Sequence, residues 1–251
     1  MKNNTELIRT RLEANGIPFR QETPEKLGIY MDLLEEWNQR MDLTAVTEPE
    51  ETADKHFIDS LTVLKTPLLE HVSTMIDVGT GAGFPGLVIA IACPEIAVTL
   101  MDSQQKRLDF LSAVCRATGT DHTILVHARA EDGGRNRLYR EQFDAATARA
   151  VAPMNTLCEY LLPFVRVQGR ALCWKGPALK NELDDGRKAA HLLGGRLEMP
   201  YSCPVDGRDW EHRILPVLKV QRTPSAYPRR AGMPKNSPLG QKLDAGSGRM
   251  I

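Results

Sequence analysis

Residues 76–86, Ile-Asp-Val-Gly-Thr-Gly-Ala-Gly-Phe-Pro-Gly, decide the fold of this chain. The run over 72–78 is largely apolar or β-branched, which predicts a buried strand that leads directly into a glycine loop. Such a loop turns tightly and lets the backbone approach a ligand with no Cβ in the way, because of Gly79, Gly81 and Gly83. At the carboxyl end of a parallel strand, a loop of this kind binds nucleotide-like ligands in open α/β sheets.

Two carboxylates help to choose among these ligands. A G-x-G pattern alone is shared with dinucleotide sites. Asp77, at the strand end, disfavours a pyrophosphate and favours a cationic ligand, and S-adenosylmethionine (SAM) carries a sulfonium and an ammonium. Asp102 closes the next strand about 20 residues beyond the loop, where a carboxylate can accept hydrogen bonds from ribose hydroxyls. The pattern favours a SAM site; a NAD-type site and a purely structural glycine turn stay open as alternatives.

The composition excludes several other classes of protein. The 251 residues allow one domain or two and bury enough surface to need neither a disulfide nor a metal. The net charge is zero, so any nucleic-acid contact has to come from a local patch. The five cysteines are scattered without a C-x-x-C pair, which argues against a zinc site and for a reducing cytoplasm. No signal peptide is expected, because residues 1–6 lack an apolar core, and no membrane span is expected, because Pro94-Glu95 interrupts the longest apolar run.

Residues 1–70 are expected to form an N-terminal helical extension. Thr23-Pro24 predicts a helix start, with an N-cap followed by proline at the first helical position. The apolar stripe that follows is interpreted as core packing against the next domain. Thr47 and Glu50 form a capping-box pattern for a further helix. His56 lies along that helix; we favour a packed or surface-bonded histidine over a substrate contact.

Strand and helix patterns alternate over 71–220, which predicts a parallel sheet. The expected strands are 72–78, 96–102, 123–127, 143–149 and 169–174, and the expected helices lie near 84–93, 104–118, 154–167 and 178–193. Asp206-Gly207 is a turn signal between 197–203 and 212–220, which predicts an antiparallel hairpin. The fold class is therefore α/β: a Rossmann-like class I SAM-dependent methyltransferase with an N-terminal helical extension and a C-terminal hairpin.

Residues 221–251 form a basic, proline-rich tail. One acid, Asp244, stands against six cations: Arg222, Arg229, Arg230, Lys235, Lys242 and Arg249. Two interpretations stay open. The segment is either a solvated, disordered tail or a basic arm that binds phosphate groups.

Cations follow three of the predicted strands: Arg129, Arg149 and Lys175. Because the carboxyl ends of parallel strands lie at one edge of a sheet, we expect them to converge near the glycine loop and to bind an anionic or electron-rich substrate. The segment Ala130-Glu131-Asp132 lies where an adenine usually binds. A backbone N–H and a nearby carboxylate in this segment can read the edge of that base.

Missing motifs restrict the chemistry. The chain has no Pro-Pro dipeptide, which methylation of an exocyclic amine typically uses, and no Pro-Cys dipeptide to carry a nucleophilic cysteine. What remains fits a nucleophile that needs no covalent help, such as N7 of guanine, whose lone pair is exposed and bears no proton. Holding N7 in line with the methyl group can supply roughly 7–11 kcal/mol. An Arg or Lys at the O6 edge would select the base.

The chain resembles the bacterial 16S ribosomal RNA guanine-N7 methyltransferases, the glucose-inhibited division protein B family. Residues 77–86 are similar to the glycine-loop signature of that family. Other motifs of the family are similar to segments further along this chain: 38–45, 55–61, Arg149-Ala150, Lys175-Gly176 and 227–234. The resemblance covers most of the chain. It departs from the family pattern at Met41-Asp42 and after Leu239.

The resemblance implies a SAM site at Gly79, Phe84, Ala130, Glu131 and Arg149. It also implies roles in methyl transfer or RNA binding for Arg129, Arg149 and Lys175. The product would be 7-methylguanosine at position 527 of 16S rRNA, made by a cytoplasmic monomer acting on that rRNA or on the small ribosomal subunit, with no metal. The alternatives are a SAM-dependent small-molecule methyltransferase and a non-catalytic RNA-binding assembly factor.

Overall fold

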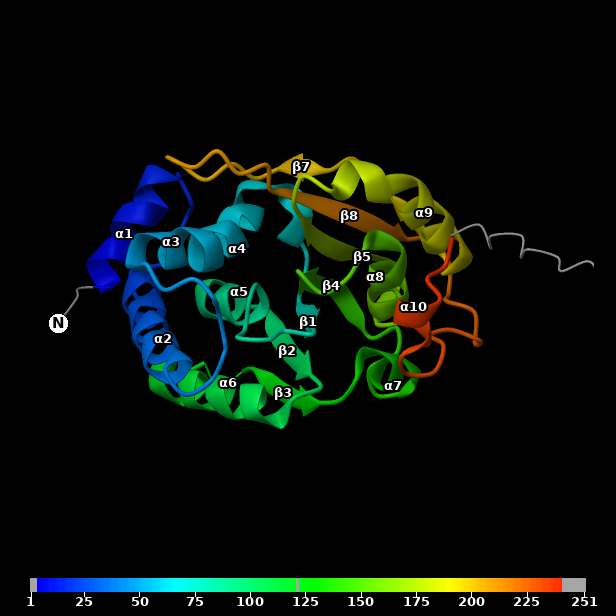
Figure 1. The fold of residues 1–251 in the computed structure, drawn as a ribbon, viewed down its shortest axis with the longest axis horizontal. Coiled ribbons are helices and arrows are strands. Elements are labelled where there is room, and N and C mark those ends of the chain that lie inside the picture. The colour runs from blue at the N-terminus through cyan, green and yellow to red at the C-terminus, as the bar shows by residue number, and fades with distance from the viewer. Residues whose placement is uncertain (1–3, 121, 241–251) are drawn as a thin grey trace, which may run out of the picture.

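The computed structural model describes residues 4–120 and 122–240, which form one mixed β-sheet with helices on both faces (Figure 1). The strand order is β3-β2-β1-β4-β5-β8-β6, and β7 pairs with β8. The strands are β1 (Thr74–Val78), β2 (Ala97–Asp102), β3 (Ile124–His127), β4 (Phe143–Arg149), β5 (Val165–Lys175), β6 (Gly195–Leu197), β7 (Tyr201–Ser202) and β8 (Arg213–Lys219). Strands β1 to β5 are parallel, as predicted, and β8 runs antiparallel to β5.

The order of the strands creates a switch point at the centre of the sheet. From β1 the chain moves outward through β2 to the edge strand β3, and then returns to place β4 on the other side of β1. The loops that leave β1 and β4 therefore diverge and leave a crevice at the carboxyl ends of the strands. Open α/β sheets bind their ligands in this position.

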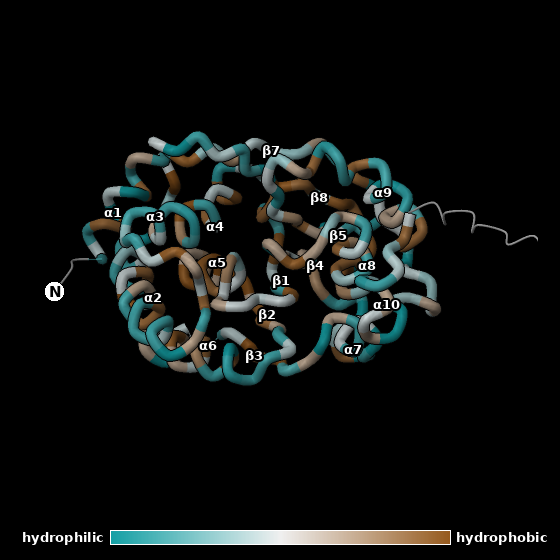
Figure 2. The backbone as a smooth tube through the Cα atoms, in the orientation of Figure 1, coloured by the Kyte–Doolittle hydropathy of each residue, from teal (hydrophilic) through white to brown (hydrophobic). Residues whose placement is uncertain are grey.

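Two hydrophobic clusters, one on each face, hold the helices to the sheet. Alternate residues of β1 divide between them, with Met75 in one cluster and Ile76 in the other. The first cluster includes residues of α1 (Asn4–Ala14), α2 (Thr23–Asn38), α5 (Gly86–Ala92) and α6 (Gln105–Thr118), and the second includes residues of α8 (Met154–Leu161) and α9 (Leu179–Leu192). Hydrophobic residues accordingly line the central strands and α5, and hydrophilic residues lie on the outer turns (Figure 2).

The N-terminal part packs against the first face, as the apolar stripe of α2 indicated. Leu27, Tyr30 and Leu34 are fully or almost fully buried in the same cluster as α5 and α6. The capping-box prediction is wrong: Glu48 precedes the next helix without a side-chain cap, because Pro49 takes its first position. That helix is composite, and consists of α3 (Pro49–Thr52), the π-helical η1 (Ala53–Ile58) and α4 (Asp59–Leu61), before the short turns η2 (Thr62–Lys65) and η3 (Pro67–Leu69).

Two other predicted boundaries are wrong, both because of proline. The helix expected over 154–167 ends at Leu161, since Pro163 has no N–H to continue it, and β5 begins as early as Val165. The first arm of the predicted hairpin is divided into β6 and β7 on either side of Pro200, which cannot donate to the ladder. Both short strands still pair antiparallel with β8.

The segment 221–240 is packed on the body of the protein, so the disordered-tail interpretation is wrong for these residues. Arg140 donates hydrogen bonds to the carbonyl oxygens of Thr223, Pro224 and Tyr227. Arg229 pairs with the fully buried Glu159 at 2.7 Å, and a short helix, α10 (Met233–Asn236), follows. Lys242, Asp244 and Arg249 lie outside the described residues. In the part of the chain described here, no helix is long and apolar enough to cross a membrane.

Candidate functional site

The glycine loop after β1 is held from the N-terminal helices. Gly79 and Gly83 have φ angles of +71° and +96°, which disfavour any residue with a side chain. A Cβ at Gly83 would also collide with the Tyr30 hydroxyl oxygen. That hydroxyl donates to the carbonyl oxygen of Ala82. Helix α2 therefore fixes the shape of the loop from outside the sheet.

Asp77 lies beneath this loop, where its side chain is fully buried. One carboxylate oxygen accepts hydrogen bonds from Thr80 Oγ1 at 2.7 Å and Gly86 N at 3.0 Å, and the other accepts from Thr147 Oγ1 at 3.0 Å. Burial raises the pKa of Asp77 to about 6, although these hydrogen bonds and Arg149 counteract the effect. The fully buried side chain thus organises the loop, and its predicted effect on a cationic ligand stays a prediction.

Asp102, at the end of β2, also binds the loop. Its two oxygens accept from Gly81 N and Gln104 N, both at 2.9 Å, and Arg107 lies 3.3 Å away. The carboxylate thus lies beside the glycine loop, and its contact with ribose hydroxyls stays a prediction. Arg107 is an additional partner that the sequence did not indicate.

A short helix, α7 (Ala130–Arg135), begins after β3 and was not predicted. Arg129 precedes it and is exposed. Glu131 is 5% exposed, and its Oε1 accepts a hydrogen bond from Gly232 N at 2.8 Å. The C-terminal segment therefore holds the carboxylate that was predicted to read an adenine.

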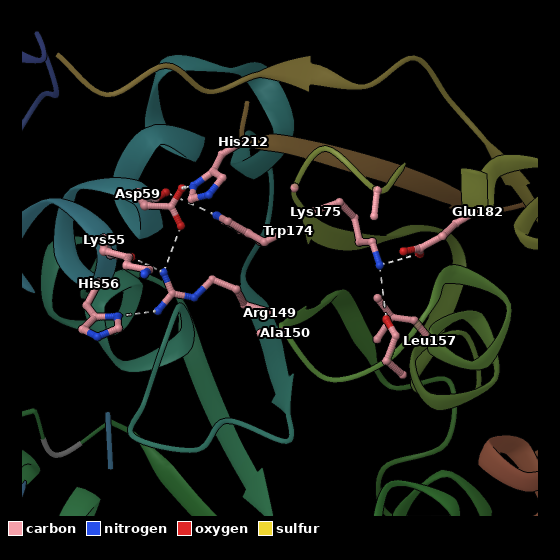
Figure 3. A pocket seen from close by; sticks show the side chains of 13 residues that line it. Lys55, His56, Asp59, Arg149, Ala150, Leu157, Trp174, Lys175, Glu182 and His212 are labelled. Atoms are coloured by element: carbon pink, nitrogen blue, oxygen red, sulfur yellow. Dashed lines mark hydrogen bonds and ion pairs between the residues drawn. The ribbon is translucent and has the colours of Figure 1, made fainter. Parts of the chain in front are cut away.

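A cavity of about 360 Å³ opens at the carboxyl ends of β4 and β5 (Figure 3). It is lined by Lys55, His56, Asp59, Arg149, Ala150, Ala152, Leu157, Trp174, Lys175, Gly176, Ala178, Glu182 and His212. Two of the three predicted cations are present here, Arg149 and Lys175. Arg129 does not line this cavity, so the predicted convergence of three cations is wrong. Arg129 follows β3, which lies four strands away from β5 in the sheet, a separation of about 19 Å.

Arg149 is fixed by three acceptors from the composite N-terminal helix. Its Nη1 donates to the Lys55 carbonyl oxygen at 2.6 Å and to Asp59 Oδ2 at 2.9 Å, and its Nη2 lies 3.3 Å from His56 Nδ1. The next residue, Ala150, has a φ of +56°, an unfavourable conformation of the kind that gathers at functional sites. The guanidinium is therefore held in one orientation at the cavity wall.

His56 is both packed and part of the cavity wall. Because arginine can only donate, Nδ1 of His56 accepts from Arg149, and Nε2 carries the proton and donates to Thr44 Oγ1 at 2.7 Å. Burial and the neighbouring Arg149 and Lys55 lower the pKa of His56 to about 3. The imidazole is therefore neutral near pH 7.

Phe84 connects the glycine loop to this cluster. Its ring stacks between Tyr30 and His56, at centroid distances of 5.4 and 4.7 Å, and the Arg149 guanidinium lies 5.2 Å from its centroid. The Phe84 side chain is buried and packs against protein.

Asp59 is a site residue that sequence reasoning missed. It is 1% exposed and accepts from His212 Nδ1 at 2.8 Å as well as from Arg149. Its carbonyl oxygen accepts from Trp174 Nε1 at 3.2 Å. Asp59 lies in the family-like segment 55–61, which was the available signal, whereas nothing in the local sequence marks His212.

Lys175 lies at the other side of the cavity in an ion pair. Its Nζ is 2.5 Å from Glu182 Oε2 and donates to the Ala152 carbonyl oxygen at 3.2 Å. Glu182 comes from α9 and was not predicted. No cluster suited to hold a metal occurs among residues 4–120 and 122–240.

The parallel sheet with its central switch point, the glycine loop after β1, the acid at the end of β2 and the cavity beside them define a class I SAM-dependent methyltransferase fold. A similar solved structure is the 16S rRNA (adenine(1408)-N(1))-methyltransferase from Catenulisporales acidiphilia, with a TM-score of 0.50 and 15% identity. The likeness covers 60% of this chain and 86% of that one, and is a likeness of fold.

The GidB family model, described as rRNA small subunit methyltransferase G, matches residues 23–207. Two relatives carry the name ribosomal RNA small subunit methyltransferase G. The protein from Alkaliphilus oremlandii is 48% identical over 210 residues, 84% of this chain and 88% of its own. The protein from Clostridium perfringens strain 13 is 42% identical over 234 residues, 93% of this chain and 98% of its own. The chain belongs to the rRNA small subunit methyltransferase G family, which confirms the resemblance.

Proposed function

We propose that this protein transfers the methyl group of SAM to N7 of a guanine in 16S rRNA, at position 527. The observation that carries the proposal is that Arg149 and Lys175 line one cavity beside the glycine loop, in a chain of this family. Two cations suit an electron-rich base and its phosphates.

The residues around the loop fit SAM. Asp77 and Asp102 place two carboxylates below and beside the glycine loop, which favours a ligand with a sulfonium and an ammonium over a pyrophosphate. Gly79 leaves the backbone open to close approach, and Ala130 and Glu131 lie at the end of β3, where the adenine would bind. SAM supplies the methyl group, and the residues around the glycine loop hold SAM in place.

The state of the titratable groups agrees with a reaction that needs no base. The lone pair of guanine N7 carries no proton, so the transfer removes none at that atom. His56 Nδ1 already accepts from Arg149, and Asp59 is held by Arg149 and His212. Orientation is then the main contribution of the chain, worth roughly 7–11 kcal/mol.

We propose three functional regions: helices over 1–70 that fix the loop and Arg149, the methyltransferase domain over 71–220, and a C-terminal segment that contacts RNA. Arg230 and Lys235 are exposed on that segment, and Arg129 is exposed at the start of α7, which the segment contacts through Gly232 and Glu131. These cations fit phosphate contacts outside the cavity. The partner is then 16S rRNA or the small ribosomal subunit, and the protein acts as a monomer in the cytoplasm.

The test is methyl transfer from labelled SAM to unmethylated small-subunit rRNA and to small subunits, followed by nucleoside mass spectrometry. We expect 7-methylguanosine at a single position. A different methylated nucleoside would keep the fold and refute N7 as the acceptor. Transfer to a metabolite without RNA would favour the small-molecule alternative, and RNA binding indifferent to SAM would favour the assembly factor.

A further inference from the structure

The cavity holds an ion pair that methyl transfer itself does not use. Lys175 Nζ and Glu182 Oε2 are 2.5 Å apart, and their side chains are only 10% and 20% exposed. Both line the cavity, on the side away from Arg149 (Figure 3). An attack by N7 requires neither a proton donor nor a base, so the pair needs another explanation.

The two side chains of the pair do not use all of their hydrogen-bond donors and acceptors. An ammonium has three donors; Lys175 donates one to the Ala152 carbonyl oxygen and forms an ion pair with Glu182. Glu182 Oε2 pairs with Lys175 and accepts a hydrogen bond from Met154 N at 2.8 Å, whereas Oε1 makes no hydrogen bond to any other residue that the structure describes. One donor and one acceptor thus remain side by side at the cavity.

This pattern is complementary to guanine. Along its Watson–Crick edge guanine presents the O6 acceptor, then the N1–H donor and the N2 amino group. Adenine presents the opposite order, an N6 donor followed by the N1 acceptor. Enzymes that act on a base commonly take it into a pocket and read this edge. Resting on the proposed function, we propose that the Lys175–Glu182 pair selects the target guanine, with Lys175 donating to O6 and Glu182 Oε1 accepting from N1–H.

The arrangement also orients the reacting atom. In guanine N7 lies beside O6, on the side away from N1. Figure 3 shows Lys175 between Glu182 and Arg149, so a base read in this way directs N7 toward Arg149 and β4. Strand β4 is adjacent to β1, which carries the glycine loop. Neither group of the pair occupies the N7 lone pair.

The competing explanation is that Glu182 only holds Lys175 in place. The two explanations differ in base selectivity, which can be measured with 2,6-diaminopurine. This base retains N7 and the N2 amino group but has an N6 donor and an N1 acceptor. Small-subunit rRNA carrying guanosine or 2,6-diaminopurine at the methylated position is assembled into subunits, and kcat/KM is measured for the wild type, Glu182→Gln and Glu182→Asp. Asp184→Asn is the matched control, since this exposed residue lies on the same helix.

We expect the wild type to prefer guanosine by roughly 100-fold or more. Glu182→Gln should lower kcat/KM on guanosine by roughly 10- to 100-fold. It should also reduce the guanosine preference at least about tenfold, because the amide can donate to the N1 acceptor of diaminopurine. Glu182→Asp keeps the acceptor and should retain the preference at a lower rate. Asp184→Asn should match the wild type.

An equal loss on both bases in Glu182→Gln would overturn the inference, as would a wild type without the preference. If Glu182→Gln does not fold, judged by its Tm and SAM binding, the ratio in Glu182→Asp decides. Failure of the proposed function is a different result, since the wild type would then form no 7-methylguanosine on any rRNA substrate.

Discussion

The two halves of the site are built in different ways. The glycine loop with Asp77 and Asp102 is shaped mainly by hydrogen bonds within about 25 residues of sequence, with Tyr30 and Thr147 as the more distant partners. The cavity around Arg149 joins an N-terminal helix, β4, β5 and the start of β8, up to 153 residues apart. The first half presents backbone and the second presents side chains. The comparison indicates that the glycine loop depends mostly on contacts close in sequence, whereas the cavity around Arg149 depends on contacts between distant segments.

The largest effect should come from Arg149→Ala, which tests whether the two halves are separable. The variant loses the fixed guanidinium, so kcat/KM for RNA methylation should fall by roughly 10²–10³-fold. The Kd for SAM should change by less than about tenfold, since Asp77 and the glycine loop remain. Single-turnover methylation and calorimetric SAM binding measure the two effects. A collapse of SAM binding of the same size would show one joint site instead of two halves.

Gly83→Ala should destabilise the glycine loop, the other half of the site. A side chain here meets both a positive φ and the Tyr30 hydroxyl, so we expect a loss of roughly 2–3 kcal/mol in unfolding free energy and weaker SAM binding. Gly119→Ala is the matched control, because its φ is +63° but a Cβ would meet no atom within 4 Å. Denaturant unfolding of both variants gives the comparison. Equal losses would mean that the contact with α2 adds nothing.

His56 makes the cavity half sensitive to acid. Its pKa is lowered to about 3 in the folded protein, so the stability from the neutral imidazole is present above pH 6.5 and declines as the pH falls toward 3. We expect about 2 kcal/mol of this contribution to be lost between pH 7 and pH 5. Asp77 acts in the opposite sense: its pKa is raised to about 6, so its contribution grows as the pH falls from about 6 to 4.

The variant His56→Gln separates the two contributions. The substitution should remove the acid-sensitive contribution of His56 to stability and leave the contribution of Asp77. The difference in unfolding free energy between the wild type and His56→Gln should therefore narrow as the pH falls from 7 to 5. Urea unfolding at several pH values measures this gap. A gap independent of pH would contradict the neutral, buried state of His56.

The smallest effect should come from the exposed cations of the C-terminal segment. Replacing Arg230 and Lys235 by alanine should weaken RNA binding severalfold and lower the salt dependence by up to about two charge units. The rate of methyl transfer at saturating RNA should remain unchanged. Fluorescence anisotropy over a range of salt concentrations measures the slope. An unchanged slope would leave the segment with a structural role only, through contacts such as that between Arg229 and Glu159.

Sequence reasoning predicted some parts of the site well, for identifiable reasons. The loop over 79–83 was predictable because a strand, three alternate glycines and an apolar helix are adjacent in sequence. Arg149 and Lys175 were predictable because parallel strands end at one edge of the sheet. Arg129 was placed with them wrongly, since the strand order sets β3 at the far edge. His212 and Glu182 were missed because no local motif marks them, and Asp59 was missed although it lies in the family-like segment 55–61.

The sequence alone determined the order of strands and helices, the class of fold and the family, because these depend on local patterning and on motifs that are contiguous along the chain. Only the tertiary structure decided which side chains share the cavity, that His56 is neutral, and that the segment 221–240 packs on the body. The physical reason is that hydrogen bonds, burial and pKa values depend on neighbours in space, and long-range contacts such as Asp59–His212 bring those neighbours together.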